Sequence, residues 1–145
     1  KDVTAGLIPD GIHSHPAMVA LAWKHKGPQR MAIVTDAMAA LGMPAGVYGL
    51  GDYKVGVDET SARLENGTLA GSIVRMDQAV RNLMTFTGCS LAQAVGSASV
   101  NVARLIRASD KGRLQPGADA DLVLLDENAN PMATIARGEV VFSKL

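Results

Sequence analysis

The sequence predicts an α/β fold in which a parallel β-α-β unit is followed by further helices and by small antiparallel β units. Two short apolar runs, residues 3–8 and 31–36, contain several β-branched residues, which is typical of buried parallel strands. A helical segment at 17–26 separates them, as a parallel crossover requires. Glycine-rich stretches with alternating polarity follow and indicate antiparallel hairpins.

Composition limits the possible partners. The chain has 145 residues, of which 48% are hydrophobic, so it is long enough to bury a core. Its formal net charge is zero, and its few aromatic residues are one Trp, two Tyr and two Phe. These features argue against nucleic acid and against an anionic membrane surface. No apolar run approaches the roughly 18 residues that a membrane span needs.

The lone cysteine and the chain start set further expectations. Cys89 cannot form a disulfide within the chain and fits a reducing compartment, so we expect a cytoplasmic protein and a buried apolar role for its thiol. The chain starts with Lys1 and shows no signal-peptide pattern. Because residues 3–8 already read as a strand, we expect a piece of a longer protein.

The first strand leads into a turn and a helix. Pro9, Asp10 and Gly11 have turn chemistry, and His13 follows them. Pro16 suits the first turn of the helix at 17–26, which the Lys-Gly-Pro sequence at 26–28 ends. Four residues share one face of this helix: Met18, Leu21, Ala22 and His25.

The second predicted strand ends at a single acidic residue. It covers residues 31–36 and ends at Asp36, after which small residues follow. In α/β folds the reacting groups gather at the carboxyl ends of the strands, so Asp36 is a candidate for chemistry. Asp is also a preferred residue where a chain leaves a strand, so Asp36 is equally a candidate cap. The local sequence leaves both interpretations open.

The middle of the chain changes character twice. Residues 43–67 are rich in glycine and alternate in polarity, which predicts an antiparallel β excursion and not a further barrel strand. Residues 73–85 then predict an amphipathic helix that Gly88 ends. Its apolar stripe consists of Met76, Val80, Leu83 and Met84.

The last third predicts two short helices and a small β unit. Ser90 and Gln93 have the spacing of a capping box at the start of a helix, and a second helical stretch covers 102–106. A glycine- and proline-containing loop at 111–117 precedes a strand at 122–125. Strands at 134–136 and 140–142 flank a closing hairpin turn.

Five motifs together resemble one enzyme family. They are Asp-Gly-Ile-His at 10–13, Val-Thr-Asp-Ala at 34–37, Asn-Gly-Thr-Leu-Ala-Gly-Ser at 66–72, Ala-Val-Arg-Asn at 79–82 and Gly-Ala-Asp-Ala-Asp-Leu-Val at 117–123. In this order and spacing they resemble the C-terminal part of the N-acetylglucosamine-6-phosphate deacetylases, a family of the amidohydrolase superfamily. The last motif alone would indicate only an amidohydrolase. The combination of the first three motifs is specific to the deacetylases.

The resemblance implies a fold. It implies the C-terminal fragment of a (β/α)8 TIM barrel, with the last two strands and their helices, plus part of a small β-sandwich domain. Residues 1–110 would form the barrel part, including the β excursion near 43–67, and residues 111–145 would form the sandwich strands. Such a fragment cannot close a barrel, so we expect uncovered strand edges and apolar helix faces.

The resemblance also implies a reaction. It is the metal-dependent hydrolysis of N-acetylglucosamine 6-phosphate to glucosamine 6-phosphate and acetate by the full-length enzyme, with this fragment inactive alone. The divalent metal, zinc or similar, would be held by a glutamate and two histidines that have no counterpart in this chain. The enzyme is expected to be a homodimer, because a neighbouring subunit would supply the arginine that binds the phosphate.

Matching positions imply roles for residues at the two strand ends. Asp36 matches the catalytic acid/base of the family. A carboxylate beside a metal can take the proton of water and return it to the departing amine. His13 matches the residue that contacts the acetyl carbonyl, where an imidazole stabilises the developing oxyanion. Two loops match the family's substrate-binding segments: Asp10, Gly11, Ile12 and His13, and Leu69, Ala70 and Gly71. Backbone N–H groups of the second loop are expected to bind sugar or phosphate oxygens.

Three alternatives stay open. His13 and His15 have the H-x-H spacing with which many amidohydrolases begin a metal site, although we expect His15 to be a rim residue. The full-length enzyme could act on another N-acyl substrate, in which case residues 69–71 would contact a different group. The chain could also be catalytically silent and associate with itself or another protein through its uncovered surfaces.

Overall fold

The computed structural model describes residues 3–145, and its central feature is the expected β-α-β unit. Strands β1 (Ala5–Leu7) and β2 (Met31–Ile33) pair in parallel, and helix α1 (Pro16–Lys26) connects them. Both strands are shorter than the apolar runs that predicted them. Pairing nevertheless continues past β2, because the N–H of Val34 donates to the carbonyl of Leu7 at 2.9 Å.

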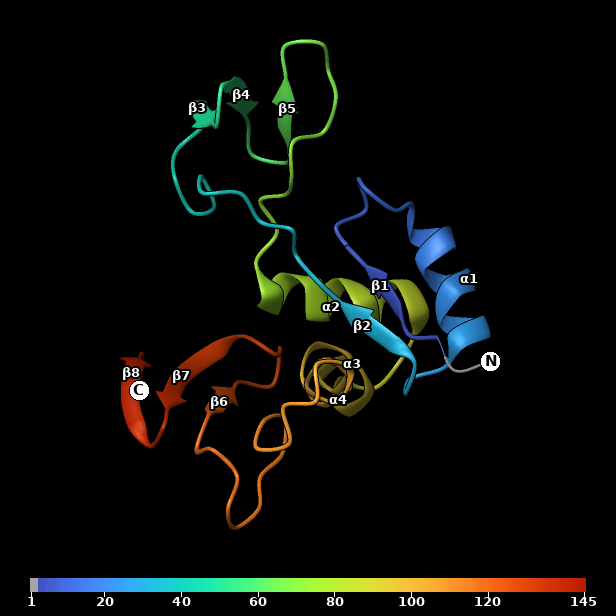
Figure 1. Ribbon diagram of the computed structural model, residues 1–145, viewed down its shortest axis with the longest axis vertical. Coiled ribbons are helices and arrows are strands. Elements are labelled where there is room, and N and C mark those ends of the chain that lie inside the picture. The colour runs from blue at the N-terminus through green and yellow to red at the C-terminus, as the bar shows by residue number, and fades with distance from the viewer. Residues whose placement is uncertain (1–2) are drawn as a thin grey trace.

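Helices cover one face of this strand pair (Figure 1). They are α1, α2 (Met76–Thr87), α3 (Leu91–Ala98) and α4 (Val100–Leu105). The core between them and the strands consists of Val19, Ile33, Val74, Ala79, Val80, Leu83, Cys89 and Ala94. Leu7 and Trp23 pack against it. On the opposite face of the pair Gly6 is exposed and Val34 is 42% exposed, whereas Ala32 is buried, so residues 3–145 cover that face only in part.

The buried face of α1 differs from the expected one. Met18 and Leu21 are 57% and 46% exposed, and His25 is also exposed, whereas Val19 is completely buried. The face that carries Met18 and Leu21 is therefore not the buried side of the helix, and His25 lies at the helix surface. The helix packs on α2 through the side that carries Val19 and Trp23. Apolar residues surround α1 on several sides, so periodicity did not identify which side meets its neighbour.

Capping explains where the other helices begin and end. The capping box at α3 is present, with Ser90 accepting from the N–H of Gln93 and the Gln93 side chain accepting from the N–H of Ser90. Gly88 ends α2 with a φ of 70°, as predicted. Helix α2 begins at Met76 and not at residue 73, because the N–H of Val74 donates to the Ser72 side chain and holds that segment outside the helix.

The β excursion is an antiparallel sheet that projects from the helical layer (Figure 1). Its strands are β3 (Gly46–Leu50), β4 (Tyr53–Val57) and β5 (Ala62–Leu64). It has a small core of its own, made of Met38, Ala40, Val55, Val57, Ala62 and Ala70. The excursion leaves and returns at one place, where Ala37 and Ser72 form a parallel bridge.

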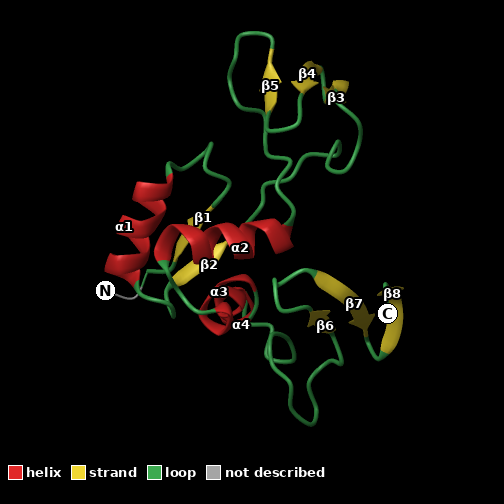
Figure 2. Cartoon of the chain, turned by 180° about the vertical axis from the view of Figure 1, so that it is seen from behind, coloured by secondary structure: helices red, strands yellow, loops and turns green. Residues whose placement is uncertain are grey.

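The last strands form a second antiparallel sheet (Figure 2). They are β6 (Leu122–Leu125), β7 (Pro131–Ala136) and β8 (Glu139–Ser143). Arg137 and Gly138, with φ values of 50° and 86°, make the tight turn between β7 and β8. Successive positive φ values are what a two-residue hairpin needs, so the predicted closing hairpin is confirmed.

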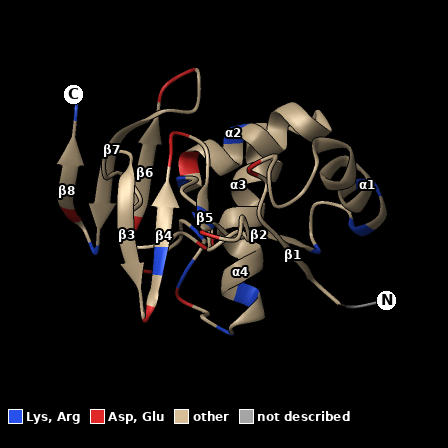
Figure 3. Cartoon of the chain, turned by 90° about the horizontal axis from the view of Figure 1, so that it is seen from above, with Lys and Arg blue, Asp and Glu red and all other residues tan. Residues whose placement is uncertain are grey.

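Charged residues are dispersed over the molecule. Figure 3 shows short acidic and basic segments interspersed in loops and helices, in agreement with the zero net charge. Within residues 3–145 we find no helix with the length and apolar character of a membrane span.

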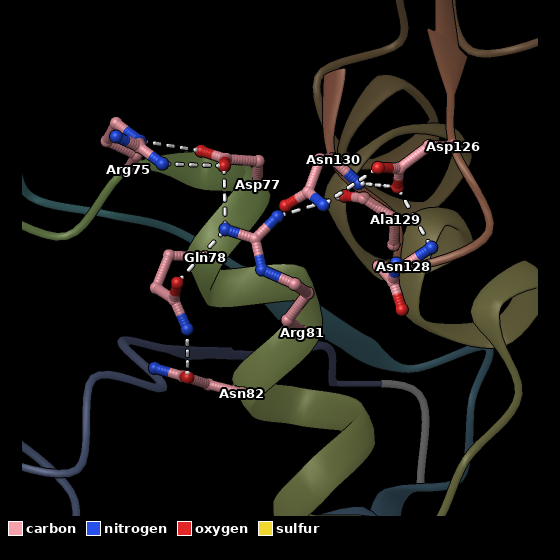
Figure 4. A network of polar contacts seen from close by, with 9 residues as sticks. All are labelled: Arg75, Asp77, Gln78, Arg81, Asn82, Asp126, Asn128, Ala129 and Asn130. Atoms are coloured by element: carbon pink, nitrogen blue, oxygen red, sulfur yellow. Dashed lines mark hydrogen bonds and ion pairs between the residues drawn. The ribbon is translucent and has the colours of Figure 1, made fainter. Parts of the chain in front are cut away.

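An ion-pair network joins α2 to the C-terminal sheet (Figure 4). Arg81 donates to the carbonyl of Ala129 at 3.0 Å, in the loop between β6 and β7, and to the carboxylate of Asp77 at 2.8 Å. Arg75 also pairs with Asp77, at 3.1 Å. Burial opposes ionisation of Asp77, but the two arginines outweigh it and lower the pKa of Asp77 to about 2.

This network predicts acid sensitivity. Because the folded-state pKa of Asp77 lies below its ordinary value of 3.8, the carboxylate stabilises the fold above that value and loses its contribution as the pH falls through about 2. We expect Asp77→Asn to lower the free energy of unfolding by about 2 kcal/mol at pH 6, with the deficit shrinking below pH 4. Urea unfolding followed by Trp23 fluorescence measures this difference.

Glu127→Gln is the control for this series. Glu127 is exposed, and no ion pair involves it in the part of the chain that the structure describes. Its variant should follow the wild-type pH dependence. A constant deficit for Asp77→Asn from pH 6 to pH 2 would contradict the assignment.

Candidate functional site

The segments that follow β1 and β2 meet at one edge of the molecule. Because β1 and β2 are parallel neighbours, their carboxyl ends lie side by side. Asp10 and His13 follow β1, and Asp36 follows β2. The structure therefore brings the predicted acid and the predicted histidine to the same rim.

The loop after β1 is built around the carboxylate of Asp10. One carboxylate oxygen accepts hydrogen bonds from the N–H groups of Ile12 and His13, at 2.9 and 2.8 Å. The other lies 2.6 Å from Nδ1 of His13. Gly11 allows the turn through its φ of 80°. The carboxylate of Asp10 thus makes its hydrogen bonds within the loop. Its contribution to the rim is to hold the His13 ring in place.

This pair fixes which nitrogen of His13 faces outward. The Asp10 side chain is only 7% exposed, and its burial opposes ionisation. Hydrogen bonds from the His13 ring and from the N–H groups of Ile12 and His13 outweigh burial and lower the pKa of Asp10. The ionised carboxylate favours a proton on Nδ1 of His13. Its Nε2 remains for a ligand, on a side chain that is 20% exposed.

Helix α2 anchors the same loop. Asn82 donates from its side-chain nitrogen to the carbonyl of Pro9 at 2.8 Å, and its oxygen accepts from Gln78 at 2.7 Å. The ring of Phe86 lies 3.6 Å from where a Cβ on Gly11 would be. This anchoring role of Asn82 was not predicted from the sequence. The available signal was a polar residue one position before the buried Leu83, on the side of α2 that faces the strands.

Asp36 is exposed and makes no ion pair within residues 3–145. Its backbone has a φ of 48°, a left-handed value that residues other than glycine rarely adopt. Within the same range the carboxylate accepts no hydrogen bond from the backbone that follows. The alternative that Asp36 is a cap is therefore wrong, and its carboxylate remains available at the rim.

The loop at 69–71 reaches the same edge from the other side of the β excursion. The N–H of Ala70 donates to the carbonyl of Ala62 at 2.9 Å, and Ala70 is 8% exposed. The expected binding of ligand oxygens by N–H groups of this loop therefore excludes the N–H of Ala70, which donates to β5. In the described chain no hydrogen bond occupies the N–H of Leu69 or Gly71. These two amides remain candidates for oxygen ligands.

Gly71 touches the candidate acid directly. Its φ is 80°, and a Cβ there would lie 2.9 Å from the carbonyl oxygen of Asp36. Real Cβ atoms do not approach a backbone oxygen so closely, so only glycine fits beside Asp36 without moving the backbone.

Within the described part of the chain the histidines do not form a metal centre with other residues. His15 caps α1, where its Nδ1 accepts from the N–H of Ala17 at 3.2 Å, while His13 binds Asp10. Across residues 3–145, no three His, Cys, Asp or Glu side chains are placed to share a metal ion. The H-x-H interpretation thus finds no third ligand here. His15 and His25 are exposed.

Comparison with known proteins gives consistent results. The pattern of the amidohydrolase family matches residues 2–141. The N-acetylglucosamine-6-phosphate deacetylase of Lysinibacillus sphaericus is 45% identical over 138 residues, which are 95% of this chain and 36% of that protein. The crystal structure of the deacetylase of the same name from Thermotoga maritima superposes with a TM-score of 0.94 at 44% identity, over 99% of this chain and 39% of that one.

A second solved structure contains a ligand. It is a variant of the Mycobacterium smegmatis N-acetyl-D-glucosamine-6-phosphate deacetylase in complex with N-acetyl-D-glucosamine-6-phosphate. It superposes with a TM-score of 0.91 at 38% identity, over 97% of this chain and 38% of that one. The chain thus spans little more than a third of the length of the proteins it matches. Its α/β part and its C-terminal sheet correspond to a fragment of their barrel plus a β domain.

Proposed function

The chain belongs to the amidohydrolase family, and we propose that it is the C-terminal part of an N-acetylglucosamine-6-phosphate deacetylase. The reaction would convert N-acetylglucosamine 6-phosphate and water into glucosamine 6-phosphate and acetate. The observation that carries the proposal is the rim shared by Asp36, an exposed carboxylate, and His13, whose ring Asp10 orients. Identities of 38 to 45% with deacetylases over nearly the whole chain support the substrate class.

The family is generally metal-dependent, and the residues present fit that chemistry. A divalent ion such as zinc, when bound, lowers the pKa of a water molecule and polarises the amide carbonyl. We propose that the remainder of the enzyme supplies its ligands. A carboxylate that no neighbouring side chain neutralises is the group needed beside such an ion, and Asp36 meets this requirement within residues 3–145.

Each residue of the rim then has a defined task. Asp36 takes the proton of the attacking water and returns it to the amine nitrogen as the carbon–nitrogen bond breaks. His13 donates from Nε2 to the carbonyl oxygen, where negative charge develops. Asp10 holds the ring for this contact, because its carboxylate lies 2.6 Å from Nδ1. The N–H groups of Leu69 and Gly71 bind sugar or phosphate oxygens.

The test is turnover by the product of the complete gene. Purified protein with added zinc should release equal amounts of acetate and glucosamine 6-phosphate from N-acetylglucosamine 6-phosphate. N-Acetylglucosamine without the phosphate should react much more slowly, and N-acetylated amino acids should not react. A preference for one of these other N-acyl compounds would replace the proposed substrate. The 145-residue chain alone should show no turnover, because the proposal places the metal ligands in the remainder of the enzyme. Activity of that fragment would contradict this placement.

A further inference from the structure

The buried Ser72 lies at the place where the β excursion leaves and rejoins the rest of the chain. We call this place the neck and define it as residues 35–38 and 71–72. Ser72 is 3% exposed. Its N–H donates to the carbonyl of Asp36 at 2.7 Å, and its carbonyl accepts from the N–H of Met38 at 2.9 Å. The backbone of Ser72 therefore brackets the candidate acid on both sides.

The hydroxyl of Ser72 adds a bond that backbone pairing cannot provide. Its Oγ donates to the carbonyl of Thr35 at 2.5 Å and accepts from the N–H of Val74 at 3.2 Å. The first bond joins residues 37 apart in the sequence, and it lies immediately before Asp36. One hydroxyl thus ties the strand end to the segment that leads into α2.

Asp36 needs such support because of its backbone. Its φ of 48° lies in the left-handed region. An aspartate without restraint populates this region only part of the time. A change in this φ would move the carboxylate from its place at the rim. Ser72 donates to the carbonyls of Thr35 and Asp36, which lie before and after the Asp36 Cα. These two hydrogen bonds restrain the rotation.

We propose that Ser72 is a positioning residue for Asp36: its hydroxyl, bound to the carbonyl of Thr35, holds the strand end so that the carboxylate stays at the reacting centre. This inference rests on the proposed function and extends it to a residue outside the loops that contact substrate. Ser72 is buried in the neck and is not expected to touch substrate. Its loss should therefore change the rate of the bound complex and leave substrate affinity unchanged.

The first measurement is the effect of Ser72→Ala on the complete gene product. We expect kcat for acetate release to fall about tenfold with KM within about twofold of wild type, since a shift of an ångström at a reacting group costs up to about 10²-fold. The fall is smaller than that limit because the backbone bond from Ser72 to Asp36 survives the substitution. Ser61→Ala is the matched control. Ser61 is also a buried serine of the β excursion, but its hydroxyl bonds to Asp58 at 3.3 Å; its variant should keep wild-type kcat.

A second pair separates the hydroxyl from side-chain volume. Ser72→Thr and Ser72→Val add nearly the same volume, and only threonine keeps a hydroxyl. We expect the Thr variant to retain a kcat several-fold above that of the Val variant. Equal kcat values for the two, an unchanged kcat in Ser72→Ala, or a raised KM at unchanged kcat would each overturn the positioning role. Inactivity of the wild-type gene product would instead refute the proposed function, so the two failures are distinguishable.

Discussion

Asp36→Asn is expected to lower kcat for acetate release by about 10² to 10⁴-fold in the complete gene product, the range attributed to one acid/base group. The amide has nearly the same size as the carboxylate but cannot take the proton of water. KM should change little, because the substitution removes a group that acts in the transition state. Since Asp36 is exposed and makes no ion pair within residues 3–145, the free energy of unfolding should stay within about 0.5 kcal/mol of wild type.

Asp52→Asn is the control for this variant. Asp52 is an exposed carboxylate in the turn between β3 and β4, away from the rim. The variant loses the same charge and should keep wild-type kcat. If Asp36→Asn also kept full activity, Asp36 would not be the proton carrier, and the proposed mechanism would need another base.

Gly71→Ala is expected to lower kcat by about 10²-fold, which is more than the loss of the Ser72 hydroxyl should cause. The new Cβ would lie 2.9 Å from the carbonyl oxygen of Asp36, so the backbone at the acid has to move. Alanine at a φ of 80° also strains the chain by roughly 1 to 2 kcal/mol. The variant should therefore show both a lower melting temperature and a lower kcat.

Gly67→Ala separates these two effects. Gly67 has nearly the same φ, 84°, but a Cβ there meets nothing within 4 Å. Its variant should lose a similar amount of stability from backbone strain and keep its kcat. Measurement of melting temperature and steady-state kinetics for both variants gives the comparison. Equal activities of the two would show that the close approach of Gly71 to Asp36 does not govern catalysis.

Local chemistry made several elements predictable from the sequence. The capping box of Ser90 and Gln93, the end of α2 at Gly88 and the turn at Arg137 and Gly138 each depend on groups within a few residues. Such interactions are encoded where they act, so the residue types at a given spacing suffice. The parallel strand pair was predictable for a related reason, because a helix between two apolar runs allows few other arrangements.

Predictions were wrong where a distant segment decided the outcome. The helix at α1 buries Val19 in place of Met18 because of where α2 lies, and α2 starts at Met76 because Ser72 holds the preceding segment. The N–H of Ala70 is not available to a ligand in the way that had been expected, because it donates to the carbonyl of Ala62. In each case several local arrangements were acceptable, and packing or pairing with another part of the chain selected one.

By itself the sequence determined which residues end the two parallel strands, and hence that an aspartate and a histidine share a rim. The tertiary structure alone decided how they are held there. Asn82 bonds to the carbonyl of Pro9, 73 residues away, and Ser72 bonds to the carbonyl of Thr35, next to Asp36 and 37 residues from Ser72. The physical reason is that a strand end has no local partner for its last carbonyl groups. Those groups are satisfied by whichever segment the fold brings beside them, and sequence spacing carries no record of it.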